Sequence, residues 1–162
     1  MFKKTFKYGL ILAGIGFLIG VAFQIVGVYN SPIQQGLVWI MLLVGLFFCL
    51  KHYRDSELEG TMSYEKALGT GIVIHIWIGF FSGIGYVINA LLNPKLHESV
   101  LEKQYQGMVD QGKGDAEIEM AMELIEILMS LWLMPFWVIF GTAFMGVFIS
   151  LVVGAIVQKK AQ

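Results

Sequence analysis

Residues 8–50 read YGLILAGIGFLIGVAFQIVGVYNSPIQQGLVWIMLLVGLFFCL and contain no Lys, Arg, Asp or Glu. A helix needs about 20 apolar residues, at a rise of about 1.5 Å each, to cross roughly 30 Å of hydrocarbon. The stretch is therefore long enough for two membrane spans. Residues 29–32, YNSP, form a turn signal in its middle, because proline disfavours helix in the residue before it. We predict one helix over about residues 8–28 and a second over about residues 33–50.

Two more stretches without charge follow at residues 67–94 and 127–158, and they predict helices over about 67–92 and 130–158. The composition agrees, since 57% of the 162 residues are hydrophobic and 14% are charged, with a mean hydropathy of +0.71. A soluble domain is about 25% charged. We expect an all-α fold, an integral membrane bundle of four transmembrane helices, and a single membrane domain over residues 1–162.

The charge and cysteine content exclude several other classes. A net charge of −1 excludes a nucleic-acid binder that depends on attraction to phosphate. The single cysteine, Cys49, excludes a disulfide scaffold and a cysteine-based zinc site. The predicted spans hold no carboxylate at their centres, no series of arginines, no paired acids, no metal-ligand spacing and no phosphate-binding loop. We therefore expect no enzyme, no metal and no cofactor.

Basic residues are concentrated on one side of the predicted spans. The two termini and the loop at residues 51–66 carry eight of the eleven, whereas the segment at residues 93–129 carries three, together with eight of the twelve acids. Cytoplasmic segments of membrane proteins are enriched in Lys and Arg. We predict an N-in/C-in topology, with the 51–66 loop inside and the 93–129 segment outside.

The outer segment is expected to contain two helical pieces. Residues 95–107 predict a short amphipathic helix, and the glycines of residues 107–114 predict a loop. From Asp115 a second helix should run without interruption into the last span as a long extension. Pro135 should kink that helix near Leu131, because its ring displaces the carbonyl one turn earlier.

Acidic residues recur at helical spacing on the second outer helix and share one face: Asp115, Glu119, Glu123 and Glu126. Such a stripe suits water, a cation or a basic partner. The Gly and Asn residues typical of a calcium loop do not interrupt it. We therefore favour a solvated face over a divalent-ion site.

Small residues lie four apart in three of the spans and form grooves that allow helix backbones to approach closely. The longest of these stripes is Gly146, Ser150 and Gly154 in the last span. We predict packing within the bundle, with a homodimer interface through these residues as the alternative.

His75 is the only ionisable side chain well inside a predicted span, and it shares a helix face with Gly71 and Gly79. An ionisable residue within the membrane is a candidate functional residue. The alternative is a neutral histidine that is hydrogen-bonded to a neighbouring helix. Asn89 and Gln24, both nearer the outer leaflet, complete this candidate intramembrane polar site.

The loop at residues 51–66 contains a candidate interaction surface formed by Tyr53, Arg54 and Asp55. It could dock a partner or a lipid headgroup. The alternative is a solvated hairpin whose long side chains anchor at the membrane interface. Ser63 is expected to cap the N-terminus of the third helix.

Several segments resemble a bacterial integral membrane family catalogued as domain of unknown function 4199. The resemblance lies in residues 7–12 (KYGLIL), 53–55 (YRD), 60–64 (GTMSY), 67–68 (AL) with Gly71, and 93–94 (NP). It implies four spans, a long segment before the last one, and the inner membrane of Gram-negative bacteria of the Bacteroidota type. It implies no activity and no functional residues, because the family has no established function.

Three functional hypotheses follow. The first is a small accessory or structural subunit that lies in membrane lipid and associates with itself or with a second membrane protein. The second is a dimeric small-molecule transporter or lipid-binding protein that uses His75. The third is an envelope sensor whose acidic outer helix responds to cations.

Overall fold

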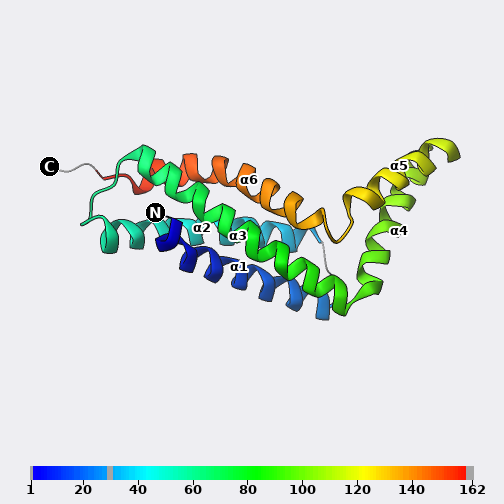
Figure 1. Cartoon of the computed structure of the whole chain (residues 1–162), viewed down its shortest axis with the longest axis horizontal. Coiled ribbons are helices and arrows are strands. Elements are labelled where there is room, and N and C mark those ends of the chain that lie inside the picture. Colours follow the sequence, from blue (N-terminus) through cyan, green and yellow to red (C-terminus); the bar gives the residue numbers. More distant parts are fainter. Residues whose placement is uncertain (1, 29–30, 160–162) are drawn as a thin grey trace. The chain divides into compact units, whose positions relative to one another are not determined.

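The computed structural model describes residues 2–28 and 31–159, over which the chain forms six α-helices and no strand (Figure 1). The helices are α1 (Phe2–Ile25), α2 (Pro32–Glu57), α3 (Tyr64–Leu92), α4 (Pro94–Asp110), α5 (Asp115–Leu128) and α6 (Met134–Val157). The all-α class is confirmed. Each of the four predicted spans corresponds to a helix that is long and apolar enough to cross a membrane, namely α1, α2, α3 or α6.

The first helix starts earlier and ends earlier than predicted. Lysine is a good helix former, so the basic residues before Tyr8 continue α1 back to Phe2. Gly27 has a φ of +77°, a left-handed conformation that glycine adopts without strain and that ends the helix. Tyr29 and Asn30 of the predicted turn lie outside the described residues.

The second helix is longer than predicted and takes in half of the expected inner loop. Pro32 stands at the start of α2, and the Ser31 hydroxyl caps it by accepting a hydrogen bond from the backbone N–H of Gln34 at 3.2 Å. No glycine or proline interrupts residues 51–57, so the helix continues to Glu57. It is followed by Gly60, which has a φ of +80°.

The predicted cap of the third helix is confirmed. The Ser63 hydroxyl accepts a hydrogen bond from the backbone N–H of Lys66 at 3.3 Å, and α3 begins at Tyr64. The acidic Glu65 lies in its first turn, where it suits the positive end of the helix dipole.

Two predictions about the outer segment are wrong. The first amphipathic helix does not end at Gly107 but continues to Asp110, because one glycine costs a helix only about 1 kcal/mol. The helix from Asp115 does not run into the last span, since α5 ends at Leu128 and α6 begins at Met134. Pro135 thus lies in the first turn of a new helix, where its missing N–H breaks no bond.

Contacts divide the chain into two compact units, Met1–Ser82 with Val138–Gln162, and Gly83–Trp137. We call them unit one and unit two and describe each by itself. The prediction that residues 1–162 form one membrane domain stays a prediction.

Unit one contains α1, α2, most of α3 and most of α6. Its core has Leu46 and Leu50 of α2 and Ile74 of α3 as fully buried side chains. The start of α1, the end of α6 and the connection between α2 and α3 lie at the same end of this unit (Figure 1). We call this the terminal end of unit one.

Close helix contacts in unit one depend on glycine. A Cβ atom added at Gly79 of α3 would lie 2.7 Å from the Cα of Ile139 in α6, and one added at Gly71 would overlap Ser150. A Cβ atom at Gly146 of α6 would overlap the ring of His75. The α3 and α6 backbones therefore approach one another closely along this face.

Unit two contains the α4–α5 hairpin. The two helices join at a turn in which Gly112 has a φ of +73°. Met108 of α4 and Ile118 of α5 are buried inside the hairpin. The remaining part of the unit is the end of α3 and the start of α6, where a Cβ atom at Gly83 would lie 3.2 Å from the Cα of Pro135.

The outer surfaces of the four long helices are apolar. Large side chains that are at least 60% exposed include Leu18, Ile40, Phe48 and Phe140. Soluble monomers rarely expose contiguous apolar patches larger than a few hundred Å². This surface is compatible with a multi-pass membrane protein whose helices face lipid.

Replacing Gly79 by alanine is expected to lower the free energy of unfolding of unit one. The added methyl group would force α3 and α6 apart, and overpacking of this kind costs about 1–3 kcal/mol. Thermal unfolding in detergent, followed by circular dichroism, measures the loss. Gly69→Ala is the matched control on the same helix, because a Cβ atom there meets nothing within 4 Å. Equal melting temperatures for the two variants would contradict the packing.

Candidate functional site

His75 lies on α3 inside unit one and is fully buried. Its Nδ1 atom is 2.9 Å from the backbone carbonyl oxygen of Gly71, one turn earlier. Its Nε2 atom is buried and has no hydrogen-bond partner among the residues that the structure describes. Buried polar groups in native proteins are nearly always paired, so an unpaired ring nitrogen in a span is a candidate binding group.

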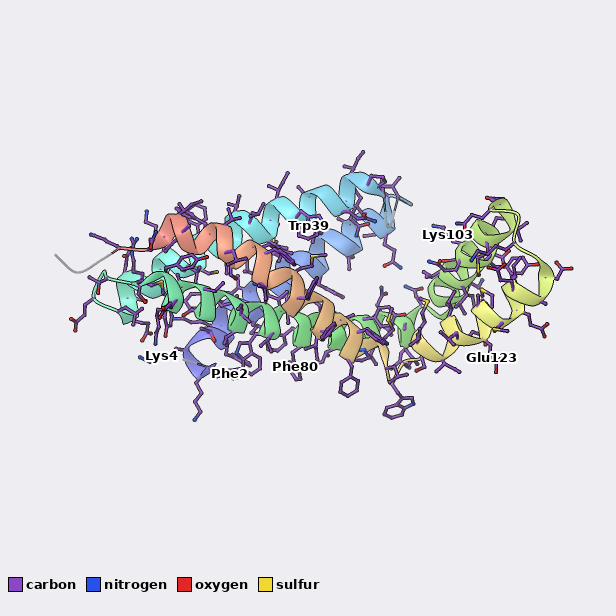
Figure 2. All side chains as sticks on the ribbon, turned by 90° about the horizontal axis from the view of Figure 1, so that it is seen from above. Phe2, Lys4, Trp39, Phe80, Lys103 and Glu123 are labelled. Carbon is purple, nitrogen blue, oxygen red and sulfur yellow. The ribbon has the colours of Figure 1, made fainter. Side chains whose placement is uncertain are left out.

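A cavity of about 390 Å³ lies beside His75, between α2, α3 and α6. Its wall consists of Gln34, Gln35, Val38, Trp39 and Leu42 from α2, His75 from α3, and Gly141, Thr142 and Met145 from α6. Trp39 is labelled on α2 in Figure 2. The wall combines an apolar surface with a few hydrogen-bonding groups, as small-molecule sites commonly do.

Among the described residues, neither Gln24 nor Asn89, the other two residues of the candidate polar site, lines this cavity. Gln24 is half-buried in the last turn of α1, and Asn89 is half-buried in unit two. The amides that line the cavity are Gln34 and Gln35. Their position after a proline, inside an otherwise apolar stretch, was the available signal, but only the packing of three helices brings them to one cavity with His75.

Arg54, a predicted interaction residue, holds the end of α6. Its Nη1 atom donates a hydrogen bond to the carbonyl oxygen of Val157 at 2.9 Å, and its Nε atom donates to Asp55 Oδ1 at 2.8 Å. A cation that binds the last carbonyl groups of a helix also interacts favourably with the helix dipole. The structure therefore gives Arg54 a role in capping within the chain.

The other two residues of this predicted surface, Tyr53 and Asp55, differ in how far they are buried. Tyr53 is buried, and its ring lies against that of Tyr8 in an edge-on arrangement with centroids 6.3 Å apart. Asp55 is exposed and lies beyond the charge-free stretch of α2. The hydrogen bond from Arg54 lowers the pKa of the Asp55 carboxyl. Stability from this ion pair is thus present at neutral pH and is lost as the pH falls through that lowered pKa.

Three further contacts join the segments at the terminal end of unit one. Met62 and Lys159 exchange two backbone hydrogen bonds of 2.9 and 2.8 Å. The Tyr8 hydroxyl is 2.8 Å from His52 Nδ1, and Lys4 forms an ion pair with Glu57. Together with the Arg54 contact, these contacts join α1, α2, α6 and the C-terminal segment at the terminal end of unit one.

The small residues of the last predicted span pack against α3 of the same chain. Gly146, Ser150 and Gly154 are all buried. Gly146 faces His75, Ser150 faces Gly71, and Gly154 lies beside Ala67 of α3. The geometry supports packing within the bundle and leaves this stripe unavailable to a second copy.

The acidic stripe of α5 lies on the surface of unit two. Asp115, Glu119, Glu123 and Glu126 are exposed, and Figure 2 labels Glu123 on α5. Within the described part of the chain, no group of three or more His, Cys, Asp or Glu side chains could hold a metal ion. A second face of α5 exposes Met120, Leu124 and Ile127, and their helical spacing was the signal in the sequence that could have marked this face.

Four long apolar helices and a polar hairpin are typical of multi-pass membrane proteins. The chain belongs to the family described as protein of unknown function (DUF4199), whose model matches residues 2–159. No curated protein and no solved structure matches the chain. The family description assigns no activity, so the roles of these residues have to be argued from their geometry.

Replacing Arg54 by alanine is expected to lower the free energy of unfolding by about 1–2 kcal/mol, because the carbonyl oxygen of Val157 loses a charged donor. Thermal unfolding in detergent measures this loss. Lys51→Ala removes an exposed positive charge from the same helix and serves as the control. If both variants melted at the wild-type temperature, the capping role of Arg54 would be wrong.

Proposed function

We propose that this chain is a non-enzymatic accessory subunit in the inner membrane of a bacterium, with both termini in the cytoplasm. In this proposal its α4–α5 hairpin lies outside the membrane and docks on a basic, amphipathic segment of a second membrane protein. The distribution of Lys and Arg and the family membership support the location.

The observation that carries the proposal is the exposed apolar face of α5. Met120, Leu124 and Ile127 lie at helical spacing and are 71%, 60% and 57% exposed. They belong to the most charged segment of the chain, which we place in water rather than in lipid. An apolar stripe of this kind on a polar helix is typical of helices that bind a groove or another helix.

The charge beside this face favours a basic partner. Glu119, Glu123 and Glu126 are exposed on the same helix, and the outer segment carries more acidic than basic residues. Helices that lie on a membrane surface are usually rich in Lys and Arg on their polar face, which α5 is not. A second copy would present the same acidic residues and be repelled, so self-association through this face is disfavoured.

A second candidate function is favoured by the cavity beside His75. A dimeric small-molecule transporter or a lipid-binding protein would use this buried ring nitrogen as the polar contact of its binding site. The accessory role and this candidate depend on different units of the chain, so each can be tested without the other.

Replacing Leu124 by serine is expected to weaken association with the partner about tenfold or more, because the buried leucine side chain contributes about 1.5–3 kcal/mol at an interface. The tagged full chain is extracted in native lipid, and intact-mass analysis measures the ratio of bound partner to chain. A photocrosslinking amino acid introduced at Leu124 then identifies the contacting segment of that partner.

Val109→Ser is the matched control, since Val109 is an exposed apolar residue of α4 in the same hairpin and does not belong to the stripe on α5. The proposal requires that the control retain the partner and that the crosslinked segment be basic and amphipathic. Crosslinks from Leu124 to lipid alone, or to a second copy of the chain, would count against it.

A further inference from the structure

The ring of His75 has one nitrogen that can accept a hydrogen bond and receives none. Its Nδ1 atom lies 2.9 Å from the Gly71 carbonyl oxygen, and a carbonyl oxygen only accepts, so Nδ1 carries the hydrogen. A charged imidazole is costly within the hydrocarbon region. The neutral ring therefore presents Nε2 as an acceptor, and that atom is buried without a partner.

The unpaired nitrogen lies on the edge of the ring away from Gly146. Gly146 of α6 faces the Cβ, Cγ and Nδ1 atoms of His75, and the Gly71 carbonyl oxygen is hydrogen-bonded to Nδ1. These two neighbours cover one edge of the ring, and Nε2 lies on the opposite edge. His75 also lines the cavity of about 390 Å³. Because Nε2 itself is buried, a ligand in the cavity has to displace the side chains that cover this atom to reach it.

The wall of the cavity suits an uncharged ligand. Val38, Leu42 and Met145 provide apolar surface, and Thr142 adds a hydroxyl group. Within the described residues no Lys, Arg, Asp or Glu lines the wall. An ionised ligand would therefore be buried there without an opposite charge, which is strongly unfavourable.

The rim of the cavity indicates that the ligand enters from the lipid. Trp39 of α2 and Met145 of α6 both line the cavity and are both 41% exposed. They lie on helices long and apolar enough to span the membrane, so their exposed surfaces face hydrocarbon. A molecule that reaches His75 between these two helices must be soluble in the bilayer.

We propose that this cavity binds an uncharged, lipid-soluble molecule through a hydroxyl group that donates its hydrogen to His75 Nε2. The apolar body of the molecule lies against Val38, Leu42 and Met145. Such a hydroxyl supplies the one hydrogen bond that Nε2 lacks. This inference is independent of the accessory role that we assign to the α4–α5 hairpin.

Among the described residues, Ser150 is the other buried polar side chain without a partner, and it does not explain the cavity. Its Oγ atom faces the position of Gly71 in the contact between α3 and α6. A serine hydroxyl in a helix can rotate to bond the carbonyl group one turn earlier. The ring of His75 is held by its contacts with Gly71 and Gly146, so its Nε2 atom has no such rotation to a backbone partner.

Two photoreactive probes that differ only in the hydroxyl group test the site. The full chain in lipid nanodiscs is labelled with a diazirine derivative of decanol or with the same diazirine derivative of decane. We expect the alcohol to label peptides that contain Trp39 or Met145 about fivefold more, the ratio expected for one neutral hydrogen bond of about 1 kcal/mol. Unlabelled decanol should compete with this labelling. His75→Phe keeps an aromatic ring beside Gly146 and should bring the two probes to equal labelling.

Nitrogen NMR of the wild-type chain tests the same contact with Nε2 and does not depend on whether the His75→Phe variant folds. Decanol should move the Nε2 resonance of His75 and leave its Nδ1 resonance in place, and decane should move neither. His52, at the terminal end, is the internal control and should not respond. Equal labelling of the wild type by both probes would overturn the proposal. An Nε2 resonance whose chemical shift does not change when decanol is added would also overturn it. Either result would leave the docking experiment on α5 unaffected.

Discussion

The close contact between α3 and α6 is the constraint on which the rest of unit one depends. Helices in a membrane gain little from the hydrophobic effect, because lipid is as apolar as their side chains. They associate through van der Waals contact, which requires that the backbones approach closely. Gly71 and Gly79 on α3 and Gly146 on α6 permit that approach. The same contact places the Cβ, Cγ and Nδ1 atoms of His75 against Gly146.

The two parts of α6 have different surroundings within unit one. Its C-terminal end is held by Arg54, and the backbone pair of Met62 and Lys159 follows directly. Towards its N-terminal end, Gly141 and Thr142 line the cavity, while Ile139 and Thr142 also pack against α3 at Gly79. The polar contacts at the terminal end thus add to the close helix packing that holds α6 in place.

The sequence predicted the features that depend on local pattern. Absence of charge located the four long helices, and Ser63 marked the start of α3, because both signals act within one helix. The break between α5 and α6 was not predicted, because proline occurs at two places in helices. In the middle of a helix it causes a kink, and in the first turn it is tolerated without one. Only the neighbouring residues 129–133, which form turns, decide between them. That Gln34, Thr142 and His75 line one cavity could not be predicted, since this requires the packing of three helices, and the spacing of residues within each helix does not say how the helices are arranged around one another.

The most direct test of the account is whether Ala67 of α3 lies beside Gly154 of α6. In a Cys49→Ser background, Ala67→Cys and Gly154→Cys are combined, and the chain is oxidised in native membranes. A Cβ atom at Gly154 lies 3.5 Å from that of Ala67, within the separation of about 3.5–4.5 Å found in disulfides. We predict an intramolecular disulfide, seen by intact mass, and none when Gly69→Cys replaces Ala67→Cys. No disulfide in the first pair, or equal yields in both, would contradict the α3–α6 contact and the His75 site that depends on it.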